Sequence, residues 1–324
     1  MVDKIKVIAV LTSGGDAPGM NPAIRAVVRC AKYYGIDVKG VRDGYQGLIN
    51  GDFIDMDARD VADILQRGGT VLHTARCMEF KTLEGQQRAA EKIRKAGIDA
   101  IVVVGGDGSF NGAMRLCEQG IPTVAMPGTI DNDISCSEYT IGYDTCLNTV
   151  IEAVDKIRDT TASHHRCSVI EVMGRAAGYI AVNAAIACGA DVVLVPEYEW
   201  NYDEDVIKPI LASTQRGKKH SIVIVAEGVG GSVELAKRIE KDTGIESRAT
   251  VLGHVQRGGS PTVRDRVVAS RMGARCVDLL REGKSNRIVC RLDGRITDVG
   301  IAEGLAMKKE FPKEYFELAK KLSY

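Results

Sequence analysis

The chain is poor in aromatic residues, has no excess charge of either sign and contains no long apolar run. Only 5% of its 324 residues are aromatic, which leaves little material for base-stacking surfaces or an aromatic sugar-binding face. Lysine plus arginine equals aspartate plus glutamate at 43 each, so the formal net charge is zero. Proteins that bind nucleic acid or anionic membranes are generally basic, and this balance disfavours both classes.

The sequence also lacks the signatures of secretion, of structural zinc and of membrane insertion. Its nine cysteines include no C-x-x-C pair, so we expect free thiols in a reducing compartment. No apolar run approaches the roughly 18 residues of a membrane-spanning helix. The apolar stretch near the start is short and leads into a glycine loop, unlike a signal peptide. We therefore expect a cytoplasmic protein.

What the chain does contain is glycine and alternating β and α segments. Glycine accounts for 35 residues, roughly 1.5 times its usual share of about 7%. Short apolar runs predict strands, and helical periodicity fills the segments between them. Continuous apolar strands separated by helices are typical of parallel sheets covered on both faces. The strands are predicted at Lys6–Leu11, Ile98–Val104, Pro122–Met126, Cys167–Val172, Asp191–Val195, Ser221–Glu227 and Ser247–Leu252.

The predicted fold is α/β, with two doubly wound, Rossmann-like parallel-sheet domains that face each other across the active site. The chain is long enough for two domains of roughly 100–200 residues each. We place the first domain at 1–142 plus 256–306 and the second at 143–255 plus 307–324. A long helix is expected to begin near Ile141, and Pro22 is expected to open another helix that runs to about Tyr34.

Three polar, glycine-rich segments follow predicted strands, where open α/β sheets bind ligands. The first, from Gly14 to Asn21, offers backbone N–H groups to phosphates, although a structural tight turn would give the same pattern. It matches neither G-x-x-x-x-G-K-[ST] nor G-x-G-x-x-G, which disfavours P-loop enzymes and dehydrogenases. The second, Gly105–Ser109, adds a carboxylate, Asp107, that could anchor magnesium or simply cap the next helix.

The third segment, Pro127–Asp133, carries Asp131 and Asp133 two residues apart. In a kinase one carboxylate can accept a hydroxyl proton while another helps to hold magnesium. An Asx-rich structural turn is the alternative. Several arginines lie beside glycines or at strand ends, where they are either solvated surface residues or phosphate ligands. They are Arg76, Arg166, Arg175, Arg248 and Arg257.

Five motifs occur together and in order: SGGDAPGMN (13–21), GGDGS (105–109), PGTIDND (127–133), MGR (173–175) and HVQRGG (254–259). This set closely resembles the bacterial-type ATP-dependent 6-phosphofructokinases over essentially the whole chain. The resemblance implies phosphorylation of the 1-hydroxyl of fructose 6-phosphate by ATP with Mg²⁺, in a homotetramer.

The resemblance also implies roles for individual residues. Asp131 would be the general base, with Thr129, Arg175 and Arg76 at the transferring phosphoryl group. The residues expected to hold ATP are Gly15, Arg76, Cys77, Gly106, Asp107, Gly108 and Ser109, with Asp107 on magnesium. Those expected at the sugar phosphate are Thr129, Ile130, Asp131, Met173, Gly174, Arg175, Glu227, His254, Val255, Gln256 and Arg257, joined by Arg166 and Arg248 of a neighbouring subunit.

An effector pocket for anions such as ADP and phosphoenolpyruvate is implied in the same way. Its residues would be Arg25, Arg29, Arg158, Gly189, Asp191, Arg216, Lys218, Lys219 and His220. Where relatives offer one further arginine, this chain has Ala58 followed by Arg59. We therefore expect weak regulation by both effectors, because a charged hydrogen bond is missing.

Glycine at positions 108 and 128 favours ATP as the donor, because pyrophosphate-dependent relatives usually carry Asp and Lys there. A carboxylate at 108 would repel the α-phosphate, and a lysine at 128 would supply charge to bare pyrophosphate. The alternatives are a pyrophosphate-dependent enzyme, an NAD- or lipid-type kinase and a catalytically silent regulatory subunit.

Overall fold

The computed structural model describes residues 5–323, which fold into two compact units. The first unit comprises residues up to Ile130, then Ile134–Thr145 and Arg257–Lys309. The second comprises Asp131–Asp133, Cys146–Gln256 and the chain from Glu310 onward. These limits differ by only a few residues from the predicted domains, but they assign Asp131–Asp133 to the second unit.

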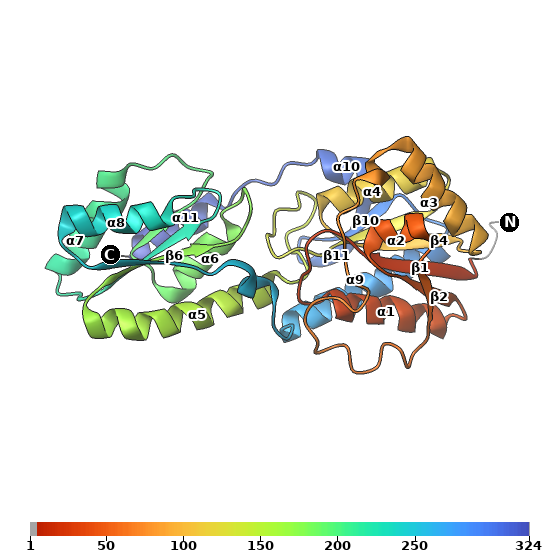
Figure 1. The fold of residues 1–324 in the computed structure, drawn as a ribbon, viewed down its shortest axis with the longest axis horizontal. Helices are drawn as coiled ribbons and strands as arrows, with labels where there is room; N and C mark the ends of the chain where they lie inside the picture. Colours follow the sequence, from red (N-terminus) through yellow and green to blue (C-terminus); the bar gives the residue numbers. More distant parts are fainter. Residues whose placement is uncertain (1–4, 324) are drawn as a thin grey trace. The chain divides into compact units, whose positions relative to one another are not determined.

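The first unit is built on a seven-stranded sheet in the order β11-β10-β5-β4-β1-β2-β3 (Figure 1). The five inner strands are parallel, and the edge strands β3 and β11 run antiparallel to their neighbours. The strands are β1 (Val7–Thr12), β2 (Asp37–Val41), β3 (Phe53–Met56), β4 (Ala100–Gly105), β5 (Thr123–Pro127), β10 (Arg287–Leu292) and β11 (Arg295–Gly300). The sheet is therefore mixed, whereas the sequence predicted a parallel one.

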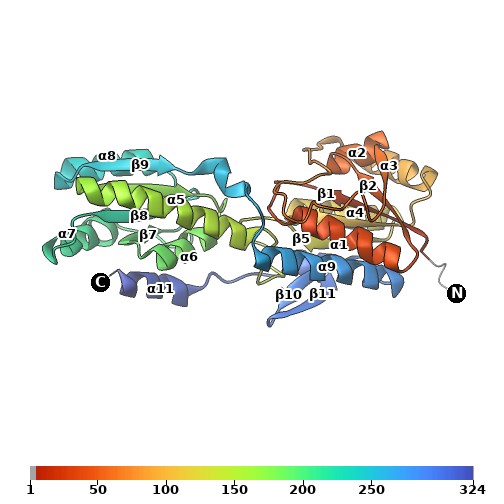
Figure 2. The ribbon, with the colours of Figure 1, turned by 90° about the horizontal axis from the view of Figure 1, so that it is seen from below.

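Helices cover both faces of this sheet because successive strand residues point to opposite sides. Ala9 and Leu11 of β1 belong to the core under α2, α3, α4 and α10. On the other face α1 and α9 lie side by side (Figure 2). The helices are α1 (Met20–Tyr33), α2 (Gly44–Asn50), α3 (Leu83–Lys95), α4 (Asp107–Glu118), α9 (Val263–Arg281) and α10 (Ile301–Ala306), with a 3₁₀ turn, η1 (Glu79–Lys81).

Helix α1 begins two residues before Pro22, which was expected at the first helical position. The proline is nevertheless accommodated, because the first four N–H groups of a helix have no intrahelical acceptor. Gly19 caps the helix at φ +122°, a conformation that glycine adopts readily.

The second unit is built on a parallel four-stranded sheet in the order β7-β8-β6-β9. Its strands are β6 (Cys167–Val172), β7 (Val192–Leu194), β8 (Ser221–Ala226) and β9 (Ser247–Val251). Its helices are α5 (Tyr143–His164), α6 (Tyr179–Cys188), α7 (Lys208–Gln215), α8 (Ser232–Thr243) and α11 (Lys313–Leu322), with shorter turns η2 (Tyr202–Ile207) and η3 (Gly253–Arg257). The first three residues of α5 belong to the first unit.

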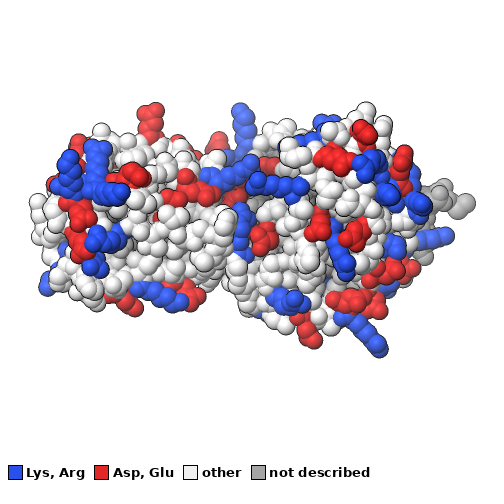
Figure 3. All heavy atoms as spheres, in the orientation of Figure 1, with Lys and Arg blue, Asp and Glu red and all other residues white. Residues whose placement is uncertain are grey.

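The core of this unit lies on both faces of its sheet. Cys167 and Val169 of β6 pack with side chains of η2, α7 and α8. On the opposite face Ser168 is hydrogen-bonded to Thr161 of α5 at 2.6 Å. None of the described helices combines the length and the apolar character needed to cross a membrane. Basic and acidic side chains are interspersed on the face drawn in Figure 3.

Candidate active site

The three predicted glycine-rich segments follow β1, β4 and β5, which are neighbours in the first sheet. We call the edge at which the parallel strands of a sheet end its carboxyl edge, and the opposite one its amino edge. From β1 the chain continues outward through β2 to β3 and then returns to β4 on the other side. This reversal is a topological switch point, where α/β sheets bind their ligands.

The first two segments are joined at short range. The Ser13 N–H donates to the Val104 carbonyl at 2.9 Å, and a side chain at Gly105 would collide with Ser13 and Ser109. Below them the buried hydroxyl of Tyr45 donates to the Ser109 carbonyl at 2.6 Å, and burial raises the pKa of Tyr45. The first two segments are therefore braced against each other and against the core.

The second segment presents a helix terminus to solvent. Helix α4 is capped by Gly106, and Asp107 is its first residue, so the alternative role of Asp107 as the N-cap is not what the structure shows. Asp107 and Gly108 are exposed, whereas Ser109 is buried. An exposed carboxylate beside the positive end of a helix dipole fits a magnesium ion held jointly with substrate phosphates.

The third segment is tightly held. Gly128 donates to the Gly105 carbonyl at 2.9 Å, and a Cβ there would lie 2.9 Å from Val104 Cγ1. The Thr129 carbonyl accepts the hydroxyl of Thr140 at 2.6 Å. Ile130 and Asp131 are buried, so the carboxylate proposed as the base sits in a fixed, largely dehydrated backbone turn.

Arg257 contacts the first segment, and Arg76 and Cys77 follow closely in the chain on Thr74, which also contacts it. Thr74, just before Arg76 and Cys77, donates to the Gly14 carbonyl at 2.8 Å. Arg257 donates to the Asp16 carbonyl at 3.2 Å, and its guanidinium occupies the space that a side chain at Gly15 would need. The family resemblance assigned Arg257 to the sugar phosphate, whereas its contacts here are with the segment assigned to ATP.

A second group of predicted residues gathers at the carboxyl edge of the second sheet. The Glu227 carboxylate after β8 accepts the backbone N–H of Gly174 at 3.2 Å and that of Arg175. The Met173 N–H donates to the buried Gln256 side chain at 3.1 Å. Arg175 is exposed with φ +58°; such a conformation is costly for a residue with a side chain and is often found at functional sites.

His254 and Val255 lie in η3, which follows β9 at the same edge of the second sheet, and both are exposed. They lie at the same edge as Met173, Glu227 and Gln256, of which Met173 and Gln256 are buried.

Arg166 and Arg248 lie at the opposite, amino edge of that sheet. Arg166 immediately precedes β6, and Arg248 is the second residue of β9. Both pair with Glu246, at 2.8 and 2.6 Å, and the hydrogen bond from Arg166 holds the pKa of Glu246 below its usual value. Within one chain these arginines are thus separated by the length of the strands from Met173 and Glu227.

The predicted effector residues of the second unit also cluster at its amino edge. Asp191, just before β7, is buried. Its carboxylate accepts hydrogen bonds from Lys218 Nζ at 2.6 Å, from Ser213 Oγ at 3.0 Å and from the Ile222 N–H at 2.9 Å. Burial, together with Lys218 and Arg158, lowers the pKa of His220. Arg158, Asp191, Lys218 and His220 therefore form one charged cluster.

The remaining effector residues are more dispersed. Arg216 contacts Ser213 at 3.2 Å, Lys219 is exposed, and Gly189 ends α6 in open space. Arg25 and Arg29 lie on α1 of the first unit, where Arg29 donates to the Ala58 carbonyl at 3.3 Å.

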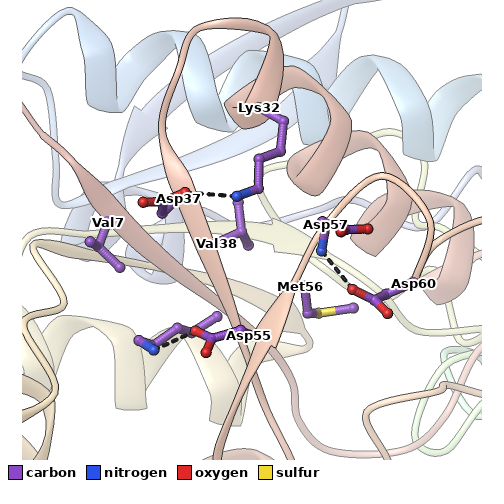
Figure 4. Close-up of a pocket in the computed structure, with 9 residues that line it drawn as sticks. Val7, Lys32, Asp37, Val38, Asp55, Met56, Asp57 and Asp60 are labelled. Carbon is purple, nitrogen blue, oxygen red and sulfur yellow. Dashed lines mark hydrogen bonds and ion pairs between the residues drawn. The ribbon is translucent and has the colours of Figure 1, made fainter.

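A hollow on the first unit lies away from the three segments, beside the start of β1 and β2 (Figure 4). Its lysines pair with two of its carboxylates, Lys32 with Asp37 at 2.7 Å and Lys39 with Asp55 at 2.5 Å, so the charges within each pair neutralise each other. The Asp60 carboxylate accepts the Asp57 N–H and closes a turn there. The hollow contains none of the predicted catalytic residues.

Two residues that hold the site together, Tyr45 and Asp265, were not predicted from the sequence. Each is buried and bonds to a segment far away in the chain, Tyr45 to Ser109 and Asp265 to Gly142. Neither belongs to a motif, and a single sequence contains no signal that pairs such distant residues.

The comparisons with known proteins agree with this arrangement. A family model described as phosphofructokinase matches residues 7–280. The ATP-dependent 6-phosphofructokinase of Clostridium acetobutylicum is 55% identical over 319 residues, which cover 98% of this chain and 100% of that protein. The ATP-dependent 6-phosphofructokinase 1 of Clostridium perfringens is 55% identical over 315 residues, covering 97% and 98%.

Solved structures are similar too. The phosphofructokinase of Saccharomyces cerevisiae superimposes with a TM-score of 0.88 at 34% identity, covering 98% of this chain and 46% of that longer chain. A pyrophosphate-dependent phosphofructokinase of Marinobacter aquaeolei reaches 0.83 at 22% identity, covering 96% and 86%; it shares the fold. With a family match over most of its length and relatives this similar end to end, the chain belongs to the phosphofructokinase family.

Proposed function

We propose that this protein transfers the γ-phosphoryl group of ATP to the 1-hydroxyl of fructose 6-phosphate, giving fructose 1,6-bisphosphate and ADP, as a glycolytic ATP-dependent 6-phosphofructokinase. The observation that carries the proposal is the convergence of three motif segments on β1, β4 and β5 at the switch point of the first sheet. The names of the relatives that align end to end support the same activity.

In this proposal the first unit binds the nucleotide. Backbone N–H groups near Gly15 and from Gly106 to Ser109, at the start of α4, suit phosphate oxygens. Arg76 would add positive charge, and Cys77, its neighbour in the chain, is assigned to the same nucleotide site. Asp107 would hold Mg²⁺, which neutralises charge on the phosphates during transfer.

A second set of residues is proposed to carry out the phosphoryl transfer. Asp131 accepts the proton of the attacking hydroxyl, a step to which a positioned base contributes typically 10²–10⁴-fold. Thr129, Arg175 and Arg76 donate hydrogen bonds to the transferring phosphoryl oxygens, where positioning and charge stabilisation provide most of the catalysis. Met173, Gly174, Glu227, His254 and neighbouring residues of the second unit bind the sugar phosphate; Ile130, Val255, Gln256 and Arg257 complete that set.

ATP is the proposed donor because of Gly108 and Gly128. A Cβ at Gly108 would meet nothing within 4 Å, so the position is open for a ligand phosphate. At Gly128 a larger side chain would push against the buried Val104, so glycine has a packing reason there as well. A pyrophosphate-dependent enzyme remains the second candidate, favoured only by fold similarity.

Arg166 and Arg248 are proposed to reach the 6-phosphate bound to a neighbouring subunit of a homotetramer. The support is their position at the amino edge, opposite Met173 and Glu227. The charged group around Asp191 and Lys218 is proposed to receive anionic effectors such as ADP and phosphoenolpyruvate, with Arg25 and Arg29 of α1. Free cysteines are compatible with the proposed cytoplasmic location.

A donor assay tests the proposal. The purified protein is given fructose 6-phosphate and Mg²⁺ with either ATP or pyrophosphate, and formation of fructose 1,6-bisphosphate is followed by coupling to aldolase. We expect turnover with ATP and none above background with pyrophosphate. Turnover with pyrophosphate alone would establish the second candidate, and turnover with neither donor would contradict both.

A further inference from the structure

The carboxylate of Asp265 is surrounded by hydrogen-bond donors of one chain segment. Its Oδ1 accepts the Tyr139 hydroxyl at 2.6 Å and the Gly142 N–H at 2.8 Å. Its Oδ2 accepts the Thr145 N–H at 2.8 Å and the Thr145 hydroxyl at 2.5 Å. The side chain is fully buried. Each oxygen thus receives one backbone N–H and one hydroxyl from residues 139–145.

This environment requires a carboxylate. Burial raises the pKa of Asp265, and the donors around it oppose that shift. Buried polar groups are costly to leave without a partner. An asparagine of the same shape would turn an NH₂ group toward one of the two oxygen positions. On either side that NH₂ would face a backbone N–H, so neither orientation of the amide satisfies the site.

The segment that Asp265 holds is itself bonded to the third motif segment. The Ile141 N–H donates to the Pro127 carbonyl at 3.0 Å. Next to it, the Thr140 hydroxyl donates to the Thr129 carbonyl at 2.6 Å. Gly128 and Ile141 form a parallel β-bridge. The backbone just before Asp131 is therefore supported by residues 140 and 141, whose neighbours are tied to Asp265.

The first motif segment rests on the same place. A Cβ at Gly19 would lie 2.5 Å from Ile141 Cγ2 and 3.6 Å from Asp265 Cβ. A Cβ at Gly142 would lie 2.7 Å from Ala17 Cβ. Such close approaches fix the turn that leads into α1 against segment 139–145. Two of the three motif segments therefore depend on one support.

We infer that Asp265 is a positioning residue for phosphoryl transfer, which it serves by fixing segment 139–145 beneath the backbone of Pro127–Thr129 and of Ala17–Gly19. The inference rests on the proposed function, because it assigns Asp265 a part in that reaction. Asp265 does not itself act on the substrate. A shift of about 1 Å in positioned reacting groups can cost roughly 10²-fold in rate.

The principal test replaces Asp265 by Asn and measures kcat and both KM values well below the unfolding temperature. We expect kcat to fall roughly 10²-fold, with both KM values within about threefold, because a misplaced catalytic segment affects the transition state more than ground-state binding. Asp278→Asn, in the same helix and half exposed, is the matched control and should retain wild-type kcat. Wild-type kcat in Asp265→Asn with only a lowered unfolding temperature would overturn the inference.

A double variant separates positioning from a loss of stability. If Asp265 acts through the segment that carries Asp131, adding Asp265→Asn to Asp131→Asn should lower kcat only a few-fold further, because residues that act as a unit are non-additive. Losses that multiply in full would overturn the inference. An inactive wild-type protein in the same series would instead refute the proposed function.

A pair of milder variants covers the case in which Asp265→Asn does not fold. Thr145→Ser keeps the hydroxyl on Oδ2, and Thr145→Val removes it. We expect Thr145→Ser to retain wild-type kcat and Thr145→Val to lose about tenfold, as expected for loss of a hydrogen bond to a charged group. Equal kcat in the two variants would overturn the inference.

Discussion

The two units distribute their predicted site residues differently. In the first, the residues assigned to ATP lie at one edge of one sheet, brought together by adjacent parallel strands. In the second, Met173 and Glu227 lie at the carboxyl edge, whereas Arg166 and Arg248 lie at the amino edge. The first arrangement can form a phosphate site within one chain. The second keeps Arg166 and Arg248 apart from Met173 and Glu227 within one chain, which is why we propose that these arginines serve the site of a neighbouring subunit.

The largest effect is expected at Asp131, which follows the hydrogen-bonded backbone of Gly128 and Thr129. Asp131→Asn should lower kcat at least about 10²-fold and change substrate affinity much less, since the amide has the same shape. Steady-state kinetics at saturating ATP and fructose 6-phosphate measure both. A folded variant with more than a tenth of wild-type kcat would exclude Asp131 as the base.

Gly108 tests whether the first unit discriminates between donors by charge. Gly108→Asp should lower kcat/KM for ATP at least about tenfold, because a carboxylate is placed near the phosphates. The chain has open space there, so the fold should be retained. Gly108→Asn is the control of equal size without charge and should lose much less. Equal ATP kinetics in wild type and Gly108→Asp would refute the donor argument.

Hybrid oligomers test whether Arg248, at the amino edge of the second sheet, serves the site of a neighbouring subunit. Arg248→Ala chains and Asp131→Asn chains should each be nearly inactive, the former because phosphate loses a bidentate partner. In mixed oligomers, some sites would pair an intact Asp131 with an intact Arg248 from another subunit. We expect measurable recovery after denaturation and refolding of the mixture. Verified hybrids without recovery would indicate that each site is built from one chain.

The smallest effect is expected at position 58. Ala58 and Arg59 are exposed in a turn closed by Asp57 and Asp60, and Ala58→Arg would restore a cationic group. We expect weak responses to ADP and phosphoenolpyruvate in the wild type and responses a few-fold stronger in the variant, because coupling needs contacts that differ between states. Fructose 6-phosphate saturation curves with each effector measure this. Strong sub-millimolar effects in the wild type would refute the expectation.

The sequence predicted the parts of this architecture that depend on local pattern. Buried apolar runs identified β1, β4, β5 and the strands of the second sheet, and glycines marked the segments that follow them. Hairpin β10–β11 was not predicted, although Asp293-Gly294 at its turn is a strong hairpin signal. Both turn residues have positive φ, at 48° and 71°.

Contacts between distant residues could not be predicted in the same way. Asp265 bonds to Tyr139 and Arg257 to Asp16, pairs separated by more than a hundred residues. Nothing in the local pattern around Asp265 or Arg257 identifies these partners, since the tertiary fold alone brings them together.

The strand order of the first sheet has a consequence for how the protein reaches its active form. The edge strands β2 and β3, which are connected through α2, and the hairpin β10–β11 pair residues close in the chain, whereas Ile8 pairs with Ala100 and Arg287 with Val124 in the centre. Non-local pairings form slowly because closing a long loop costs entropy before the contacts that compensate for it can form. The three motif segments directly follow central strands β1, β4 and β5. During refolding we therefore expect the pairings at the edges to form before the central ones, and catalytic activity to return only with the central ones.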